Sequence, residues 1–332
     1  MEKLLEENMI YNELGNTGMK VSLLSFGGSQ LVNNTNEEEA IETVHEALHC
    51  GVNYIDTAPW YGFGKAEVIL GKALREVPRE SYYLATKVGR YLPQNKFMFD
   101  FSYKRTLLSV EESLKRIGVD YFDVIQVHDL EFASNPEIII NETLPALQKI
   151  KEAGKAKFIG VTGYSLQALQ TVLDKSKIHI DTVLSYCRCT PFDQSLLEYL
   201  PYFKAKNLGI INAGILGMGL LTNREIPNWH PVIEPIKISC RNAASYCQER
   251  GIDIAKLAAQ YAFNVPNIDT HLIGMSKLRD LRNNLATLNN KPTSDEEDAL
   301  KEIMDRFFKP LKQTHWENVE VERYRKALKE KS

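Results

Sequence analysis

Short apolar runs alternate with longer stretches of helical periodicity along most of this chain, and this alternation limits the fold more than any other feature. The apolar runs begin near residues 22, 53, 82, 122, 157, 181, 209 and 270. The first seven follow one another at intervals of roughly 24 to 40 residues, the size of one strand plus one helix. Eight such units predict an α/β fold of the TIM-barrel type, (β/α)8, formed by residues 1–332 as a single domain.

A doubly wound open sheet is the alternative α/β architecture for such an alternation. An open sheet that binds a dinucleotide normally has a glycine-rich turn directly after its first strand. The corresponding turn here, residues 27–30, reads Gly-Gly-Ser-Gln and does not match. The glycine cluster at 214–219 comes late in the chain and has the reverse spacing. The regular count of eight units therefore favours the closed barrel.

Three additions to the barrel are expected. The turn signal at 15–18 lies between two short apolar-flanked pieces and predicts an N-terminal hairpin. Residues 221–238 carry three prolines and Trp229, and they predict a long loop after strand seven that overhangs the strand ends as a lid. Residues 295–308 and 317–329 predict helices that pack outside the barrel.

Composition excludes several classes of protein. The chain is 44% hydrophobic and 25% charged, and its net charge of −3 gives no reason to expect nucleic acid or an anionic membrane as a partner. The acidic N-terminus lacks the apolar stretch of a signal peptide, and no run long enough to cross a membrane is present. Five cysteines without a secretory signal favour free thiols in a reducing compartment, so a cytoplasmic location is expected.

Four residues that could take part in catalysis lie at or just after the ends of successive apolar runs. The second run delivers Asp56, and Tyr61 follows five residues later; the third run ends on Lys87 and the fourth on His128. The carboxyl ends of parallel barrel strands meet on one face. We therefore expect these four side chains to converge in the barrel mouth.

An acid, a lysine, a phenol and an imidazole can together donate a proton to a carbonyl oxygen. Asp56 would pair with Lys87, and the ammonium beside Tyr61 is expected to pull the tyrosine pKa below its usual value of roughly 10. His128 would supply a second hydrogen bond to the substrate oxygen. Since no side chain donates hydride, such a site implies a nicotinamide cofactor.

Simpler interpretations of these residues were weighed against this one. Asp56, Lys87 and His128 could form an ordinary ion-pair network at the barrel rim, since such networks also shift pKa values. The spacing of Tyr61 and Lys65 fits the tyrosine and lysine of short-chain dehydrogenases, but the two intervening glycines disfavour the helix that this pair requires. The two cysteines of 187–189 have no further cysteine pair or histidine spacing beside them, so no metal site is expected.

The same residues resemble the aldo-keto reductase superfamily over about residues 10–290. The resemblance rests on the segments 15–22, 55–58, 61–62 and 85–87 and on the strand end at His128. It implies a catalytic tetrad of Asp56, Tyr61, Lys87 and His128, with Tyr61 as the proton donor. Within the superfamily, 161–164 and 184–187 look most like the L-galactose dehydrogenase branch.

The resemblance also implies a set of cofactor contacts. Thr162 and Gly163 would lie near the nicotinamide amide, where many members have serine and asparagine, and Ser185 stands near the usual position of an amide-binding glutamine. The remaining positions resemble the pyrophosphate loop and the adenosine end: Leu216, Gly217, Gly274, Ser276, Lys277 and Asn284.

Cofactor preference and substrate are less determined by the sequence. Lys277 and Arg279 could pair with a 2′-phosphate and favour NADP(H), whereas Asp280 opposes it and the L-galactose dehydrogenase branch resembles a user of NAD(H). The expected partner is a small carbonyl or alcohol. The resemblance alone suggests a sugar such as L-galactose, while the aromatic loops would equally suit a larger apolar carbonyl. A barrel that binds cofactor as a sensor or regulatory subunit with little turnover is the alternative.

Overall fold

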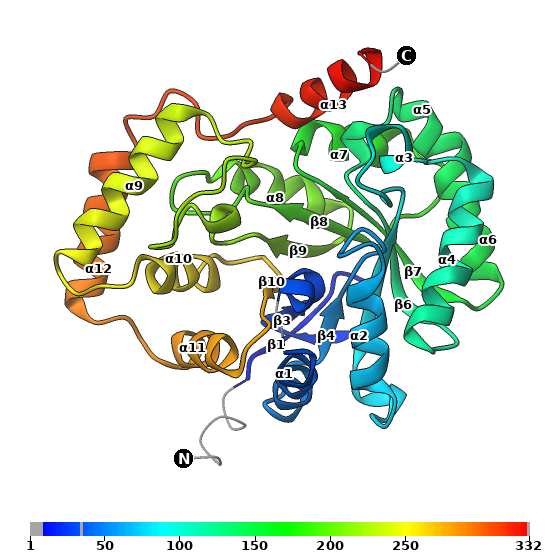
Figure 1. The fold of residues 1–332 in the computed structure, drawn as a ribbon, viewed down its shortest axis with the longest axis horizontal. Helices are drawn as coiled ribbons and strands as arrows, with labels where there is room; N and C mark the ends of the chain where they lie inside the picture. Colours follow the sequence, from blue (N-terminus) through cyan, green and yellow to red (C-terminus); the bar gives the residue numbers. More distant parts are fainter. Residues whose placement is uncertain (1–8, 34–35, 331–332) are drawn as a thin grey trace.

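Eight parallel strands close into a barrel in the computed structural model, which describes residues 9–33 and 36–330 (Figure 1). The barrel order is β10-β3-β4-β5-β6-β7-β8-β9, so every strand pairs with its neighbours in the chain and the last strand pairs with the first. The strands are β3 Leu24–Gly27, β4 Tyr54–Asp56, β5 Tyr83–Val88, β6 Phe122–Val127, β7 Ala156–Gly163, β8 Thr182–Tyr186, β9 Gly209–Ala213 and β10 Thr270–Gly274. The predicted (β/α)8 fold is confirmed.

Helices surround the barrel and pack on the outward faces of the strands (Figure 1). They are α1 Glu37–His49, α2 Lys65–Leu74, α4 Tyr103–Ile117, α6 Leu144–Glu152, α7 Leu166–Lys175, α8 Ser195–Ala205, α10 Ile254–Phe263 and α11 Leu278–Asn289. Short helical turns precede two of them: α3 Asn95–Met98 and α5 Pro136–Ile138.

Local signals explain where several helices begin and end. Asn36 caps α1 by accepting hydrogen bonds from the backbone N–H groups of Glu38 and Glu39, next to three acids in the first turn. Ser102 caps α4, and Gly118 ends it in the left-handed conformation, with φ of 81°. The helix α2 begins only at Lys65 after Gly64, so Tyr61 and Lys65 do not share a helical face.

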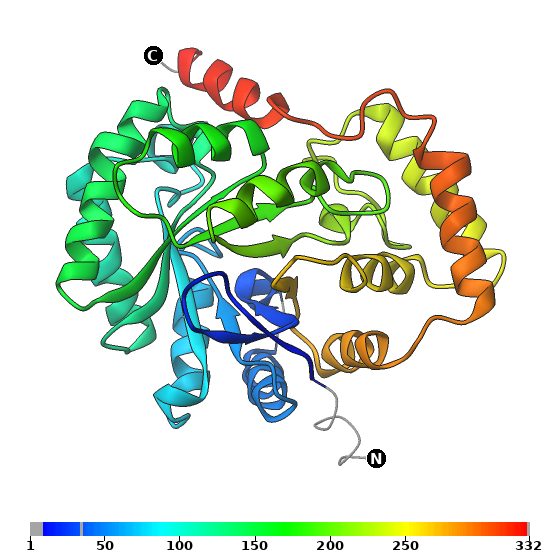
Figure 2. The same cartoon turned by 180° about the vertical axis from the view of Figure 1, so that it is seen from behind.

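An antiparallel hairpin of β1 Tyr11–Glu13 and β2 Lys20–Ser22 lies across the starts of the barrel strands, in dark blue in Figure 2. Three of its neighbouring apolar side chains, Leu14, Met19 and Val21, join the inward-facing residues of the strands in one buried cluster. The hairpin therefore plugs the floor of the barrel. Residues 20–22 belong to this hairpin, and the first barrel strand begins at Leu24, two residues later than the apolar run suggests.

The prediction that residues 221–238 form a loop is wrong for the carboxyl end of this range. The helix α9 Glu234–Gln248 begins inside it, and Pro235 occupies the first turn of that helix, where its missing N–H costs nothing. The long interval between β9 and β10 thus contains two helices, α9 and α10.

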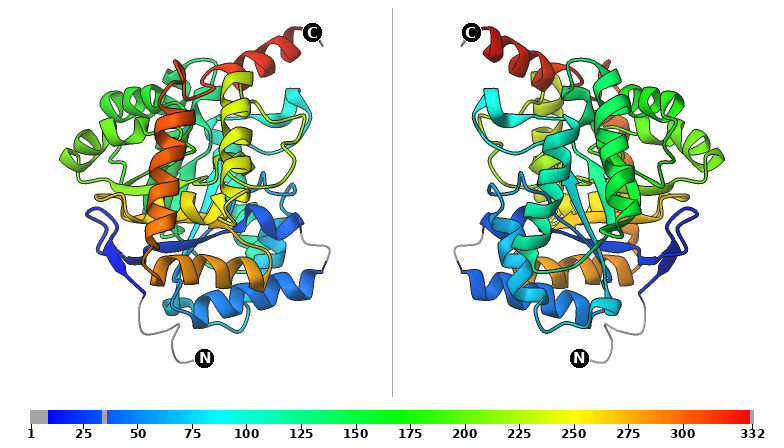
Figure 3. Two further views of the ribbon diagram at one scale, coloured as in Figure 1. Left: turned by 90° about the vertical axis from the view of Figure 1, so that its left-hand side faces the viewer. Right: turned by 90° about the vertical axis from the view of Figure 1, so that its right-hand side faces the viewer.

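The C-terminal part adds α12 Ser294–Ile303 and α13 Val319–Lys329. The helix α12 packs beside α9 at one side of the barrel, as the orange and yellow-green helices of Figure 3 show. None of the helices in the described residues is long and apolar enough to cross a membrane.

Candidate active site

The four predicted catalytic residues lie together at the carboxyl ends of β4, β5 and β6. Asp56 is the last residue of β4, Lys87 lies near the end of β5, and His128 directly follows β6. These side chains are almost fully buried, with exposures of 0%, 2% and 6% of the residue. Tyr61 reaches them from the turn between β4 and α2. The predicted convergence at one face of the barrel is therefore present.

The Lys87 ammonium group is the centre of the hydrogen-bond network. It forms an ion pair with Asp56, and it donates hydrogen bonds to the backbone carbonyl of Thr57 at 2.9 Å and to the Tyr61 hydroxyl at 3.2 Å. The second oxygen of Asp56 accepts a hydrogen bond of 2.7 Å from the Gln126 amide. This satisfies the two buried charges of the ion pair.

Sequence reasoning missed Gln126. The available signal was its alternation with Val124, which faces the barrel interior. A glutamine on an inward face, one strand from a buried acid, needs a polar partner.

The expected lowering of the Tyr61 pKa is wrong. Burial raises the pKa of Tyr61 above its usual value, and the nearby Lys87 ammonium only partly opposes this. Burial also raises the pKa of Asp56, against the effects of Lys87 and Gln126. For Lys87, burial lowers the pKa, but Asp56 and Tyr61 outweigh it and keep the amine charged. At neutral pH Tyr61 therefore holds its proton beside a charged lysine.

His128 is a neutral imidazole in this environment. Burial lowers its pKa to about 3, although Asp129 acts in the opposite direction. Its ring stands edge-on to the Tyr61 ring, with centroids 5.9 Å apart and planes at 88°. Its Nδ1 atom has no hydrogen-bond partner within the described part of the chain. The imidazole thus lies beside Tyr61, with Nε2 3.6 Å from Asp129 Oδ2.

A second buried ion pair, not anticipated from the sequence, flanks the first. Arg90 Nη1 donates a hydrogen bond of 2.6 Å to Asp129 Oδ2, and Asp129 is the chain neighbour of His128. The Arg90 guanidinium carbon lies 4.1 Å from the centroid of the Trp60 ring, and Trp60 is the chain neighbour of Tyr61.

The predicted contacts to the nicotinamide lie on the strands next to the tetrad. The backbone registers place Gly163 of β7 beside Ser185 of β8, and Thr162 one residue earlier on β7. The Thr162 hydroxyl accepts a hydrogen bond of 3.3 Å from the Asp129 N–H. The buried Ser185 hydroxyl has no partner among the residues that the structure describes. An unsatisfied hydroxyl at a strand end fits a site that holds a polar ligand group.

Gly163 differs from the asparagine common in the resembling superfamily, and the structure gives a steric reason. A Cβ atom at this position would lie 2.7 Å from Glu131 Oε2, so the Glu131 carboxyl fills the space of a side chain. Glu131 Oε1 accepts a hydrogen bond of 2.8 Å from the Tyr164 N–H. Burial, with Asp129 nearby, raises the Glu131 pKa to about 8, so this carboxyl is mostly protonated at neutral pH.

The residues expected at the pyrophosphate and adenosine end follow β9 and β10. Leu216 is half-buried and Gly217 has φ of 58°, and a side chain at 217 would also collide with Phe192. Gly274 ends β10, and Lys277 is exposed directly before α11. Ser276 is buried, and Asn284 of α11 is half-buried. The expected cofactor residues thus lie on β7, on β8 and on the segments that follow β9 and β10, whereas the tetrad residues lie on or follow β4, β5 and β6.

Between the two outer helices α12 and α13, the C-terminal segment also contacts residues that follow β7 and β8 at the barrel mouth. Trp316 stacks on the Tyr164 ring at 4.9 Å between centroids, and its backbone N–H donates a hydrogen bond of 2.9 Å to the Tyr164 hydroxyl. Glu317 forms an ion pair of 2.6 Å with the buried Arg188, just after β8. Beyond it, α13 runs along the upper edge of the molecule in Figure 1 and contacts α3.

The opposite end of this segment contacts the tetrad side of the barrel. Tyr324 of α13 packs against Phe99 and Phe132, with ring centroids 5.1 and 5.7 Å apart. The shortened loop at 221–233 meets the same segment, because the His230 ring contacts Trp316 at 5.2 Å. Trp229 itself is 65% exposed.

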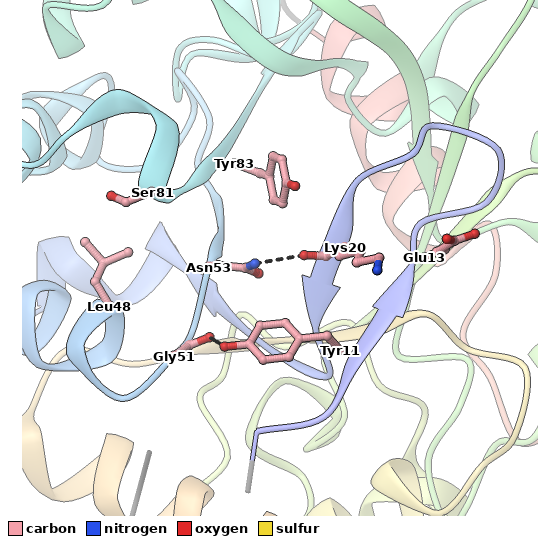
Figure 4. A pocket seen from close by; sticks show the side chains of 8 residues that line it. All are labelled: Tyr11, Glu13, Lys20, Leu48, Gly51, Asn53, Ser81 and Tyr83. Carbon is pink, nitrogen blue, oxygen red and sulfur yellow. Dashed lines mark hydrogen bonds between the residues drawn. The ribbon is translucent and has the colours of Figure 1, made fainter. Parts of the chain in front are cut away.

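Two hollows lie away from the tetrad. The one in Figure 4, of about 870 Å³, lies between the hairpin and the strand starts and is bordered by hydrogen bonds from Tyr11 to Gly51 and from Asn53 to Lys20. The other, of about 780 Å³, lies between α8, α10 and α12. Neither contains a residue of the tetrad, so position at the strand ends identifies the candidate site, not the size of a hollow.

A closed (β/α)8 barrel with a buried aspartate, lysine, tyrosine and histidine at its carboxyl end defines a class of barrel oxidoreductases. Residues 23–305 match the model of the Aldo/keto reductase family, and the chain belongs to this family. Aldo-keto reductases use NAD(P)H to interconvert carbonyls and alcohols, and this chain is an oxidoreductase of that kind.

Sugar dehydrogenases are among its relatives. The chain is 41% identical to L-galactose dehydrogenase of Arabidopsis thaliana, over 91% of this chain and 95% of that protein. It is 34% identical to D-arabinose 1-dehydrogenase of Saccharomyces cerevisiae, over 74% and 76% of the two chains. Among solved structures, the holo form of an aldo-keto reductase from Bacillus halodurans aligns with a TM-score of 0.74 and 26% identity, over 89% and 96%.

Proposed function

We propose that this protein is an NAD(P)-dependent aldose oxidoreductase in which Tyr61 transfers a proton to or from the substrate oxygen. The observation that carries the proposal is the hydrogen bond of 3.2 Å from the buried Lys87 ammonium to the Tyr61 hydroxyl. Because the ammonium donates to the phenol oxygen, the phenol's own proton is directed to another acceptor. A carbonyl oxygen that enters beside Tyr61 and His128 would be that acceptor.

The charges behind Tyr61 suit this proton transfer. When the tyrosine loses its proton, the phenolate forms next to Lys87, whose ammonium stabilises it. Asp56 and Gln126 hold the ammonium in place. His128 is neutral, so it can donate a hydrogen bond without adding charge to the pocket.

The chain's residues fit a nicotinamide cofactor on the neighbouring strand ends. The Ser185 hydroxyl, which has no partner in the described residues, and the Thr162 hydroxyl lie where the family resemblance implies the nicotinamide amide, and Gly217 and Gly274 stand at the segments after β9 and at the end of β10. When bound there, the cofactor supplies or accepts the hydride. The protein residues bind and orient the cofactor, and Tyr61 transfers the proton.

We propose an aldose as the substrate because two relatives are named as dehydrogenases of L-galactose and D-arabinose. L-Galactose is the first candidate, since that relative covers nearly the whole chain.

For the cofactor we propose a preference for NADP(H) over NAD(H). Lys277 is exposed at the start of α11, where a helix N-terminus favours phosphate. Asp280, which would repel a phosphate, lies 3.8 Å from Arg279 and is partly neutralised by it.

Turnover assays test the proposal. The protein would be incubated with a panel of aldoses and plain aldehydes and each nicotinamide cofactor, with absorbance at the nicotinamide band as the readout. Tyr83→Phe is a matched control, because Tyr83 lies on the same strand as Lys87 but borders the hollow at the opposite end of the barrel. Saturable cofactor binding without turnover on any substrate would instead support the sensor alternative.

A further inference from the structure

Arg90 lies against the chain neighbours of both residues that face the substrate oxygen in the proposed site. It follows Lys87 by three residues, on the loop after β5. Its Nη1 atom donates to Asp129 Oδ2 at 2.6 Å, and its guanidinium carbon lies 4.1 Å from the Trp60 ring centroid. Trp60 precedes Tyr61, and Asp129 follows His128. Asp129 Oδ2, which accepts this hydrogen bond, also lies 3.6 Å from His128 Nε2, so the guanidinium is close to the residues that would hold the substrate oxygen.

The protein does not satisfy all the hydrogen-bond donors of this guanidinium. Arginine carries five N–H donors, and the buried Nε of Arg90 has no partner in the described residues. The side chain is 16% exposed, whereas Asp129 below it is 4% exposed. Between the Asp129 carboxylate and the Trp60 indole, the Arg90 side chain keeps a small exposed edge.

The surroundings of this edge combine aromatic faces with balanced charge. The ring centroids of Phe99 and Phe132 lie 5.2 and 5.7 Å from the guanidinium carbon of Arg90. Glu320, on α13 above the mouth, is close enough that Arg90 lowers its pKa against the stronger raising effect of burial. With two acids near one arginine, the edge has no excess positive charge to attract a phosphate or carboxylate substrate. Aromatic walls with a few placed donors and acceptors suit a neutral hydroxylated molecule.

We propose that Arg90, held by Asp129 and Trp60, is a specificity residue that donates a hydrogen bond to a hydroxyl group next to the reacting carbon of the substrate. This inference rests on the proposed function and assigns a residue to the recognition of its polyhydroxylated substrate. A substrate without that hydroxyl would leave the guanidinium donor unpaired in a partly buried site, and such sites discriminate strongly against analogues that lack the group.

A purely structural role for Arg90 makes a different prediction. If Arg90 only anchors the Asp129 loop, its loss would displace His128 and reduce turnover of every carbonyl substrate by the same factor. The hydroxyl-recognition role predicts a loss that depends on whether the substrate carries a hydroxyl beside its carbonyl. Two aldehydes of equal chain length, glyceraldehyde and propanal, separate these cases.

The experiment compares Arg90→Met with the parent protein in the reduction of both aldehydes. The expected result is a fall in kcat/KM of about 10- to 100-fold for glyceraldehyde, mostly through KM, with a change below about 3-fold for propanal. Equal losses for the two aldehydes, or no loss for either, would overturn the assignment.

Arg79→Met is the matched control. Arg79 Nη2 forms the same kind of buried pair with Asp123, at 2.6 Å, and stacks 4.0 Å over the Tyr121 ring, but at the start of the strands. It should lower thermal stability and leave the ratio of glyceraldehyde to propanal turnover unchanged.

A binding measurement separates failure of this inference from failure of the proposed function. The intrinsic tryptophan fluorescence would be titrated with galactitol, an unreactive polyol, in the parent and in Arg90→Met. A saturable response in the parent that is weakened at least about 10-fold in Arg90→Met supports the assignment even if neither aldehyde is turned over. A parent response that the substitution does not change, or no response in the parent, overturns it.

Discussion

Removal of the Lys87 ammonium group should destabilise the fold more than removal of any exposed lysine. In Lys87→Met, the Asp56 carboxylate stays fully buried and keeps only the hydrogen bond from Gln126. The Thr57 carbonyl also loses its donor. Breaking a buried ion pair by removing one partner typically costs about 3–5 kcal/mol, because the other charge is left without compensation.

The double variant Lys87→Met with Asp56→Asn tests this reasoning directly. Asparagine removes the stranded charge, and its carbonyl oxygen can still accept the hydrogen bond from Gln126. We expect the double variant to be at least about 2 kcal/mol more stable than Lys87→Met alone, although it contains more substitutions. Both variants should have lost nearly all activity.

Urea denaturation followed by circular dichroism at pH 7 would measure these free energies of unfolding. Lys72→Met is the control, since the ion pair of Lys72 with Glu37 has side chains that are 46% and 42% exposed. That substitution should cost less than about 1 kcal/mol. The reasoning fails if Lys87→Met is no more costly than Lys72→Met, or if the costs of the two single variants at positions 87 and 56 simply add.

Four further predictions address the proposed chemistry. Tyr61→Phe should reduce kcat by at least about 10²-fold and leave the Kd for cofactor nearly unchanged, as stopped-flow and fluorescence titration would show; an unchanged kcat contradicts the proton-donor role. Because burial raises the Tyr61 pKa, the rate of alcohol oxidation should keep increasing with pH through the usual tyrosine range near roughly 10, while the rate of reduction stays high over that range; a pH profile that is flat in both directions would be inconsistent with this. Since the Glu131 pKa is about 8 in the folded protein against 4.5 ordinarily, folding stability should fall as pH rises between these values, by at most about 5 kcal/mol, and Glu131→Gln should abolish this fall in urea denaturation at several pH values. Lys277→Ala should lower kcat/KM for NADPH about 10-fold and leave that for NADH unchanged; equal values for both cofactors in the parent would reject the assignment.

The barrel and its four chemical residues could be predicted because both depend on short-range patterns. Apolar runs that end on Asp56, Lys87 and His128 identify strand ends, and a parallel barrel brings successive strand ends to one face whatever the loops do. His128 comes directly after β6, and Tyr61 lies on the loop after β4, five residues past Asp56. The predicted position of these residues therefore needed no knowledge of long-range contacts.

The positions that were missed depend on contacts between distant parts of the chain. Gln126 reaches Asp56 across 70 residues, and Trp316 stacks on Tyr164 across 152. An amphipathic pattern shows that α13 forms but not which surface it covers. Pro235 was misread for a different reason, since a proline is equally compatible with a loop and with the first turn of a helix.

The burial of Tyr61 and His128 bears on which of these two residues donates the proton. Sequence reasoning counted the ammonium as a neighbour but not the loss of solvent around the phenol, and burial is the larger effect. Burial likewise holds the His128 pKa near 3, so an imidazolium is not populated at neutral pH and His128 can donate a hydrogen bond but does not act as a general acid. The pocket thus contains two neutral groups, Tyr61 and His128, next to two ion pairs, Lys87 with Asp56 and Arg90 with Asp129. Of the two neutral groups, only Tyr61 has a cation in hydrogen-bond contact to stabilise the form that remains after proton transfer. This asymmetry favours Tyr61 over His128 as the proton donor in the proposed reaction.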